Sequence, residues 1–468
     1  MESQHTLLTA AEIHPHSPDH WIAFGQMYFD CGEYEKSLAA FHKAVQISSE
    51  NGSAWLTIAY IAQILKNHTE ATQAAREVLQ LDPNSEQAHL ILAESLRHLG
   101  HFDKAIPHYE AVIRDNPNHV HALYGYGQAL LATGDLERGW LGFEARRLCD
   151  VGTWGNHFLP DWNGESGKLC SVLAYGEGGV ASEIQLASCL PDLAKQVGHC
   201  FVECNASLRT LFERSFPGMT VISQSGDAIV PDQYPGMYFD AQVAFGSLPR
   251  FFRSEFEQFP LQQSYLVADA QKTAHWKRLF DNLPGDRKIG ILAEGSWSPE
   301  PKEHCRIPWN GITKLLSSIS SDDVRWVSLQ HGRLRKEWQQ FCSGTTAKVS
   351  YFPEVFGNDL DELAALIAAL DMVIAPSGFQ AHLAAALGLP CWVVLPQECD
   401  WHWHLSKNHS PWYPAVRLFR QKHGETRDRL SQRVLVALHS YLSYGDQIPI
   451  IPFSTRNSGY TLQNAMGG

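Results

Sequence analysis

The sequence predicts an α-helical repeat array followed by two α/β lobes, each built on a parallel sheet. A spacing of 34 residues recurs in the first third of the chain, and after Trp154 short apolar runs alternate with helical patterns. Repeated pairs of amphipathic helices stack into a solenoid, whereas alternating strands and helices form parallel sheets covered on both faces. With 468 residues, the chain is long enough for several such domains.

The repeats are defined by residue types that recur at one spacing. Trp21 aligns with Trp55, and Gly100 aligns with Gly134. We expect about four units over residues 18–147, within a repeat domain at 1–150, each unit being two helices joined at a turn. Small residues recur where two helices must approach closely, at Gly25, Ala59, Ala93 and Gly127.

The remainder contains apolar runs that predict strands in two series. The runs are Cys170–Tyr175, His199–Glu203, Thr220–Ser223, Lys288–Ala293, Arg325–Gln330, Met372–Ala375, Cys391–Pro396 and Val416–Phe419. The turn-rich stretch Asn282–Arg287 separates the series, so we expect one Rossmann-like lobe at 151–284, a second at 285–444 and a tail at 445–468. Two such lobes facing across a cleft suit a nucleotide-bearing ligand.

Composition narrows the possible partners. The chain has 37 Lys and Arg against 50 Asp and Glu, a formal net charge of -13, which argues against a protein that coats nucleic acid. No apolar stretch has the length of a membrane span, and the first 20 residues lack the pattern of a signal peptide. The 10 Cys form no C-x-x-C pair, so we expect a reduced, cytoplasmic protein.

A strand, a turn at Pro376–Gly378 and a helix from Phe379 form the most informative segment. Backbone N–H groups at the start of a helix suit a phosphate or diphosphate. Ser377 can cap the helix or donate to a phosphate oxygen, and His382 in the first turn can donate to the same anion. The alternative is an ordinary strand–turn–helix with a hydrogen-bonded core histidine, because many α/β units have this pattern.

A glycine-rich turn lies between the first predicted strand and the next helix. Gly178 and Gly179 would let the backbone approach a ligand closely. Glu177 and Glu183 are candidate proton acceptors facing the cleft. The turn has neither the Gly-Lys-Ser/Thr ending of a P-loop nor the G-x-G-x-x-G pattern of a dinucleotide site. The alternative is a tight turn with two solvated carboxylates.

Together these segments resemble bacterial tetratricopeptide-repeat proteins whose C-terminal region is a heptosyltransferase-like glycosyltransferase of the GT-B fold. Such proteins are distant analogues of the repeat-bearing protein O-GlcNAc transferases. The resemblance runs from the repeats to about Gln421. It rests on ordered blocks that include Pro160–Gly164, the glycine-rich turn, Val327–Gln330, the His382 segment and Ser410–Pro414.

The resemblance implies transfer of a sugar from a nucleotide donor, held mainly by the second lobe, to an acceptor. We expect that acceptor to be a protein docked by the repeats, with Gly178 and Gly179 on the acceptor side. No metal or other cofactor is demanded, since the helix dipole and cationic side chains can supply the positive field. The residues expected at the donor are Ser377, Gly378, His382, Gln330, Gly295, Ser296 and Arg306.

The sequence departs from the family at the aspartate that is expected to act as the general base. The family's turn reads Glu-Gln-Gly-x-Gly-Asp, whereas residues Glu177 to Ser182 end in serine, with Glu183 next. Loss of a general base alone lowers the rate by roughly 10²–10⁴. Glu183, Ser182 and Glu177 are therefore the catalytic candidates. Either Glu183 has taken over, a different donor is used, or catalysis is lost and a scaffold or nucleotide-binding adaptor remains.

Several aromatic residues near the C-terminus leave two alternatives open. They either stack on a base or sugar or pack an irregular loop. These residues are Trp401, Trp403, Trp412 and Tyr413.

Overall fold

A computed structural model describes residues 17–149, 159–165, 167–224, 238–295, 306–319, 323–331, 335–344, 348–357, 359–397, 399–404 and 408–444. These residues form two compact units. The first contains the residues up to 149 together with 397 and 399–404, and the second contains the others. Ser296 and the predicted tail at 445–468 lie outside the described residues.

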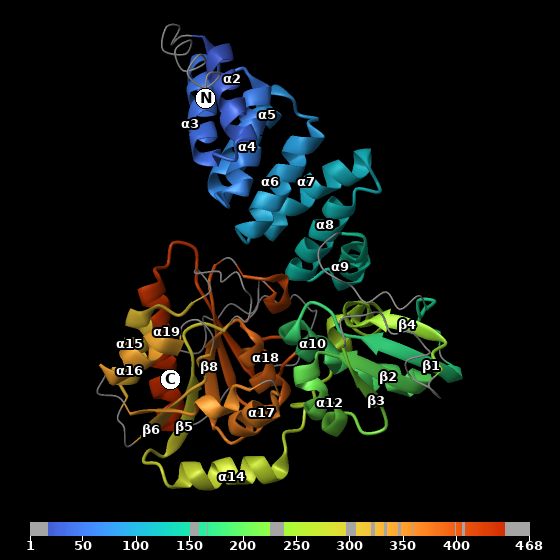
Figure 1. Ribbon diagram of the computed structural model, residues 1–468, viewed down its shortest axis with the longest axis vertical. Helices are drawn as coiled ribbons and strands as arrows, with labels where there is room; N and C mark the ends of the chain where they lie inside the picture. The colour runs from blue at the N-terminus through green and yellow to red at the C-terminus, as the bar shows by residue number, and fades with distance from the viewer. Residues whose placement is uncertain are drawn as a thin grey trace, which may run out of the picture. The chain divides into compact units, whose positions relative to one another are not determined.

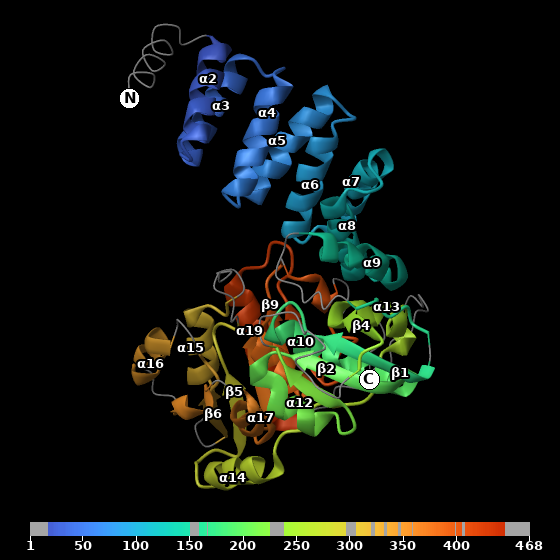
Figure 2. The same cartoon turned by 45° about the vertical axis from the view of Figure 1, so that its right-hand side comes forward.

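The first unit is a stack of helix pairs (Figures 1 and 2). Gly100 and Gly134 turn the chain between paired helices with φ of 72° and 100°, left-handed values that favour glycine. This stack confirms the predicted repeat array. The pairs are α2 (Pro18–Asp30) with α3 (Tyr34–Ile47), α4 (Gly52–Ile64) with α5 (His68–Leu81), α6 (Glu86–His98) with α7 (Phe102–Asp115), and α8 (Val120–Thr133) with α9 (Leu136–Phe143).

Small residues set the distance between paired helices, as the sequence predicts. A Cβ on Gly127 would lie 2.5 Å from the carbonyl carbon of Gly142, and one on Gly25 would lie 2.8 Å from the ring of Phe41. Both distances are too short for any side chain. The helices can therefore pack this closely only with glycine at these positions.

The last repeat is covered by a segment from much later in the chain, inside the range predicted for the second lobe. Short helix η10 (Trp401–Trp403) packs on α8. The ring centroid of Trp401 lies 5.4 Å from that of Trp140 and 5.2 Å from that of Phe143, with both contacts edge to face. All three rings are buried. Because the last repeat of a solenoid has no following neighbour, residues 399–404 act as its cap. Trp401 therefore packs inside the protein.

The first sheet of the second unit is parallel, in the order β3-β2-β1-β4. Its strands are β1 (Gly167–Tyr175), β2 (Val197–Cys204), β3 (Thr220–Ser223) and β4 (Ala241–Ala244). Strand β4 is an addition to the strands that the sequence predicts. The accompanying helices are α10 (Val180–Leu186), α11 (Leu190–Gln196), α12 (Arg209–Ser215) and α13 (Leu248–Phe252).

The second sheet is also parallel, in the order β10-β9-β8-β5-β6-β7, and α14 (Ala270–Asp281) precedes it in the chain. Its strands are β5 (Arg287–Ile291), β6 (Val324–Ser328), β7 (Val349–Tyr351), β8 (Met372–Pro376), β9 (Cys391–Leu395) and β10 (Val416–Arg420). Its helices are α15 (Trp309–Ser317), α16 (Arg335–Ser343), α17 (Asp361–Ala368), α18 (Phe379–Ala386) and α19 (Arg427–Tyr444). Short 3-10 turns lie at Glu144–Leu148, Ala187–Cys189, Ala206–Leu208, Phe245–Ser247, Phe256–Gln258 and Pro353–Val355.

Helices cover both faces of the second sheet (Figure 1). Alternate strand residues such as Trp326, Ile374 and Trp392 share one core with α15, α16 and α19. The other face carries α18, which packs on β8 and β9 and against α17. This arrangement confirms the predicted fold class of a helical repeat region followed by Rossmann-like α/β lobes.

Strand order places one switch point in each sheet. In the first sheet the chain runs outward from β1 to β3 and returns to β4 on the other side of β1. In the second it runs outward from β5 to β7 and returns to β8 beside β5. Ligands of open parallel sheets bind outside the carboxyl ends of the strands at such points. A ligand is therefore expected at the ends of β1 and β4 or at the ends of β5 and β8.

Across the part of the chain that the structure describes, no helix has both the length and the apolar character needed to cross a membrane.

Substitution Trp401→Ala tests the cap of the repeat array. Truncating a buried tryptophan lowers the free energy of unfolding by about 3–5 kcal/mol, so we expect faster amide hydrogen exchange in α8 and α9. Trp338→Ala is the matched control, because Trp338 is as deeply buried but lies in α16 of the second unit. Unchanged exchange in α8 and α9 of the Trp401 variant would contradict the capping role.

Candidate functional site

The switch point of the second sheet is a contact between two stretches of backbone. Gly295 follows β5, and Ser377 and Gly378 follow β8. A Cβ on Gly295 would lie 2.9 Å from the carbonyl oxygen of Ser377, and a Cβ on Gly378 would collide with the carbonyl oxygen of Gly295. The φ of Gly378 is 168°, an extended value open to any residue, so the close approach is what requires glycine. Backbone alone therefore forms this edge.

Helix α18 begins at this edge. Gly378 is its N-cap residue and has no side chain to cap the helix. Ser377 precedes it, and both of its predicted roles, as a helix cap or as a donor to a phosphate oxygen, stay predictions. The carbonyl oxygen of Gly378 accepts from the N–H groups of Ala381 at 3.1 Å and His382 at 3.2 Å. The first turn thus points its backbone N–H groups toward the end of β8.

His382 is buried in the first turn of α18. Its Nδ1 atom lies 2.9 Å from the hydroxyl oxygen of Tyr413, and the two rings meet edge to face. This placement matches the alternative of a hydrogen-bonded core histidine. Its role at a donor stays a prediction.

Two further predicted donor residues support the end of β5. Gln330 is completely buried, and its Oε1 accepts from the N–H groups of Ala293 at 2.9 Å and Glu294 at 3.0 Å. Its Nε2 donates to the carbonyl oxygens of Glu294 and His331. Arg306 donates from Nε to Glu294 Oε1 at 3.1 Å. Gln330 thus holds the residues after β5 in place through hydrogen bonds to their backbone, and Arg306 forms an ion pair with Glu294. Their expected places, Gln330 beside the donor and Arg306 as a nearby cation, stay predictions.

Glu177 ties together the switch point of the first sheet. It follows β1, and its Oε1 accepts at 2.7 Å from the N–H group of Gly246, which follows β4. The residue is only 8% exposed. Gly178 and Gly179 beside it are exposed and have φ of 72° and 82°. In the predicted acceptor-side turn, Gly178 and Gly179 are therefore accessible, whereas the carboxylate of Glu177 beside them is buried.

Glu183 is buried under the same turn, 1% exposed, and its Oε2 accepts from the N–H group of Asn205 at 2.7 Å. Burial, helped by the nearby charges of Glu203 and Glu177, raises the pKa of Glu183 to about 7, although the hydrogen bond from Asn205 opposes this rise. The expectation that Glu177 and Glu183 face an open cleft, and the alternative that both are solvated, are therefore wrong. Among the catalytic candidates Ser182 is the partly exposed one.

The structure brings the two predicted turns close together through their helices. Helix α10, which follows the glycine-rich turn, packs against α18. Tyr265, in the segment joining the lobes, contacts both helices. Its hydroxyl donates to the carbonyl oxygen of Ile184 at 2.8 Å, and its N–H group donates to the carbonyl oxygen of Ala386 at 3.1 Å. Helices α10 and α18, which follow the glycine-rich turn and the turn at Pro376–Gly378, are therefore packed together.

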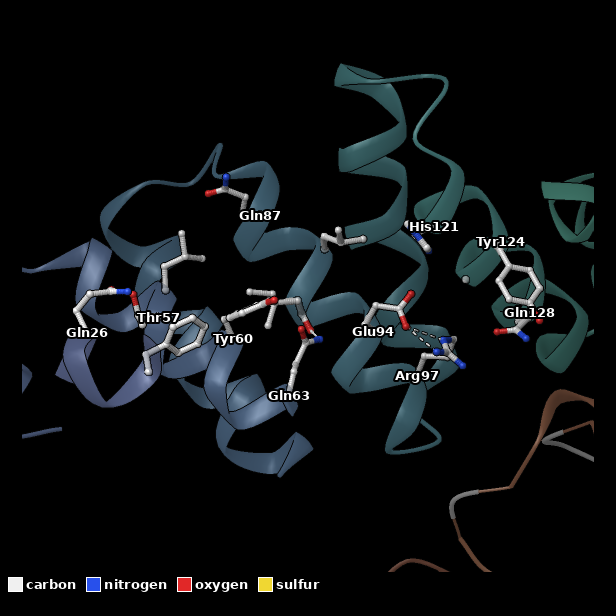
Figure 3. A pocket seen from close by; sticks show the side chains of 15 residues that line it. Gln26, Thr57, Tyr60, Gln63, Gln87, Glu94, Arg97, His121, Tyr124 and Gln128 are labelled. Atoms are coloured by element: carbon white, nitrogen blue, oxygen red, sulfur yellow. Dashed lines mark hydrogen bonds and ion pairs between the residues drawn. The ribbon is translucent and has the colours of Figure 1, made fainter. Parts of the chain in front are cut away.

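The repeats contain a second candidate site, an open groove of about 940 Å³ (Figure 3). It is lined by α2, α4, α6 and α8, the first helix of each pair. Its lining side chains occupy equivalent positions in successive repeats. One such series, with 34 residues between members, is Gln26, Tyr60, Glu94 and Gln128. Sequence reasoning missed this series, although the same spacing that defines the repeats contains it.

Charged groups in the groove neutralise one another. Arg97 Nη2 lies 2.6 Å from Glu94 Oε2, and Tyr109 donates to Glu94 Oε1 at 2.7 Å. Figure 3 shows the Glu94–Arg97 pair on the groove wall. Burial alone would raise the pKa of Glu94, but the charge of Arg97 and these hydrogen bonds hold it below its usual value. A Cβ on Gly125 would lie 2.6 Å from Glu94 Oε1, so glycine there leaves room for the network. The groove therefore presents mainly amide, aromatic and aliphatic groups.

Fold and site define the class of this chain. It joins a tetratricopeptide-repeat array to two α/β lobes, each built on a parallel sheet. Family models of the tetratricopeptide repeat match residues 20–51, 52–85 and 90–139, which confirms the predicted repeats.

Known proteins resemble one or both parts of the chain. It is 27% identical over 383 residues to Protein FlbA of Caulobacter vibrioides, which covers 78% of this chain and 63% of FlbA. The chain thus spans less than two thirds of that relative's length. The structure of E. coli ADP-heptose LPS heptosyltransferase II is 15% identical to this chain in sequence. The match covers 58% of this chain and 98% of the heptosyltransferase chain, with a TM-score of 0.43. YrrB, a repeat protein with an unusual peptide-binding site, has 20% identity, coverages of 32% and 77%, and a TM-score of 0.28.

Substitution Glu183→Gln tests the buried carboxyl through stability. Because the folded pKa of about 7 lies above the unfolded value of 4.5, Glu183 costs stability progressively as pH rises between these values. The glutamine keeps an acceptor for Asn205 but cannot ionise. We expect the variant to match the native protein at pH 4 and to be more stable by about 3 kcal/mol at pH 8, at 1.4 kcal/mol per pKa unit.

Urea unfolding across pH 4–8 measures this difference. Glu183→Ala is the control, since it cannot ionise either but loses the bond to Asn205, so it should be less stable than the glutamine variant at every pH. A difference between the glutamine variant and the native protein that does not change with pH would refute the raised pKa.

Proposed function

We propose that this chain is a GT-B-type glycosyltransferase that moves a sugar from a nucleotide-sugar donor to a protein acceptor docked by its repeats. The observation that carries the proposal is the backbone contact between Gly295 and Gly378 at the switch point of the second sheet. Open parallel sheets bind nucleotides at this location, and α18 begins there with Gly378 as its N-cap residue.

In this proposal the diphosphate of the donor lies against the first turn of α18. The N–H groups after Gly378 and the helix dipole stabilise the negative charge that grows on the leaving diphosphate. The hydroxyl of Ser377 donates to a phosphate oxygen. Gln330 keeps the end of β5 in place, because its four hydrogen bonds to backbone fix the residues that precede Gly295. We propose no metal or other cofactor.

The acceptor in this proposal is an extended, uncharged segment of a protein lying along the groove. The amides of Gln26 and Gln128 suit hydrogen bonding to peptide groups, and Tyr60 and Tyr124 suit apolar side chains. A charged segment would fit less well, because the Glu94–Arg97 pair is already neutralised.

A second candidate function is a nucleotide-binding adaptor that has lost catalysis. The observation that favours it is the use of both candidate bases in holding the first lobe together. Glu177 accepts from Gly246, Glu183 accepts from Asn205, and Ser182 stands where the family has aspartate. Donor binding without transfer to any protein would favour the adaptor.

Substitution Ser377→Ala tests the donor site. A panel of nucleoside-diphosphate sugars should contain one that stabilises the protein by about 2.7 kcal/mol at 100 times its Kd. Loss of one hydrogen bond to a charged phosphate costs about 1.5 kcal/mol, so the variant should bind that donor about tenfold more weakly in calorimetry. Ser317→Ala is the control, since that hydroxyl bonds within α15. If no donor stabilises the protein, both candidate functions fail.

Substitution Tyr60→Ala tests docking in the groove. Tyr60 is 50% exposed on the groove wall, and truncating an aromatic anchor typically weakens binding about tenfold or more. With a labelled donor, we expect transfer to cellular proteins to fall about tenfold while hydrolysis of the donor without acceptor is unchanged. Leu141→Ala, at an exposed residue of α9 away from the groove, should change neither rate. An equal fall in both rates would contradict docking in the groove.

A further inference from the structure

The repeats contain a small pocket that is separate from the groove. It has a volume of about 270 Å³, is lined by α3, α4 and α5, and shares no lining residue with the groove. Helix α4 packs against both α3 and α5 (Figure 2). Pockets that hold drug-sized ligands have volumes of roughly 300–1,000 Å³, so this pocket suits a single side chain rather than a cofactor.

Three kinds of side chain line this pocket: an aromatic ring, aliphatic groups and a carboxylate. The ring is that of Trp55 in α4, which is held by a hydrogen bond of 2.9 Å from its Nε1 to the carbonyl oxygen of Ser49. The aliphatic groups belong to Val45 and Ile58, and the carboxylate belongs to Glu70 in α5. A long side chain with an apolar stem and a charged end matches such a lining.

Glu70 determines the sign of the charge that the pocket accepts. Its Oε1 lies 2.5 Å from His42 Nε2, and its Oε2 accepts from Asn67 Nδ2 at 2.7 Å. A neutral imidazole or amide that donates to a carboxylate leaves the negative charge in place. In the part of the chain that the structure describes, no lysine or arginine is paired with Glu70, whose side chain is 25% exposed. The pocket therefore favours a cation.

The first repeat shows which cation suits a tryptophan at this position. Trp21 aligns with Trp55 at the 34-residue spacing, and Lys43 Nζ lies 4.1 Å from the centroid of the Trp21 ring. A lysine ammonium over an indole face is attracted by the negative face of the ring. The residue that aligns with Lys43 in the second repeat is Glu77. The second repeat thus has an acidic residue where the first repeat has the lysine that covers its tryptophan.

We propose that this pocket binds a lysine side chain of a partner protein. The ammonium group meets the Trp55 ring and the carboxylate of Glu70, and the methylene groups lie along Val45 and Ile58. The formal net charge of -13 favours the approach of a basic partner. The inference does not depend on the proposed function, because the pocket is separate from both the groove and the second unit.

Nuclear magnetic resonance of the full chain labelled with ¹⁵N-tryptophan tests the proposal. The probe is acetyl-lysine amide, and acetyl-norleucine amide is its uncharged match. The indole signal missing from Trp55→Phe identifies Trp55. We expect the lysine probe to shift this signal saturably and the norleucine probe to leave it in place. The signal of Trp21 should not move, because Lys43 already covers that ring. No saturable shift at Trp55, or an equal response to both probes, would overturn the proposal.

Glu70→Gln is the informative variant, because it keeps an acceptor for His42 but removes the charge. Exposed ion pairs contribute modestly to affinity, so the lysine probe should bind about threefold to fivefold more weakly. Glu137→Gln is the matched control, since it removes the same charge from an exposed position on α9. Unchanged affinity in Glu70→Gln, or an equal fall in both variants, would overturn the proposal. If Glu70→Gln fails to fold, the comparison of the two probes on the native protein still decides.

Discussion

Contact between the backbones of Gly295 and Gly378 determines the shape of the switch point in the second sheet. Because no Cβ fits at either position, the end of β5 and the start of α18 approach more closely than side chains would allow. The first turn of α18 is thereby placed at the switch point, where a parallel sheet leaves room for a ligand. Gln330 holds the end of β5, and the hydrogen bond between His382 and Tyr413 holds the first turn of α18.

Both lobes use a buried polar side chain to tie two strand ends together. Gln330 does so in the second lobe and Glu177 in the first, each through N–H groups of the neighbouring strand's end. Such buried groups are costly unless fully bonded, so their partners fix the local backbone. The same requirement explains why Glu183 is unsuited to meet an acceptor directly. Its carboxyl is needed by Asn205 and is closed to solvent.

Periodicity predicted most of the fold, because 34-residue repeats and long apolar runs record burial directly. Strand β7 has three residues, too few to form a pattern, and β4 consists of two alanines, a glutamine and one valine, which have weaker strand character than the Thr-Val-Ile-Ser of β3. The glycine turns were found, but the roles of Gln330 and Glu177 were not, because partners such as Gly246 lie far away in the sequence. The cap by Trp401 was hidden for the same reason. In a sequence, aromatic residues in a loop have the same pattern whether they bind a ligand or pack on a repeat, as Trp401 does on Trp140.

Amide hydrogen exchange at Gly378, Phe379 and Gln380 tests the central claim most directly. If a diphosphate is held by the first turn of α18, a saturating nucleoside-diphosphate sugar should slow exchange at these amides by at least tenfold. The same ligand should leave the groove lined by α2, α4, α6 and α8 unaffected. A donor that binds tightly yet leaves these three amides unprotected would contradict a donor site at this edge.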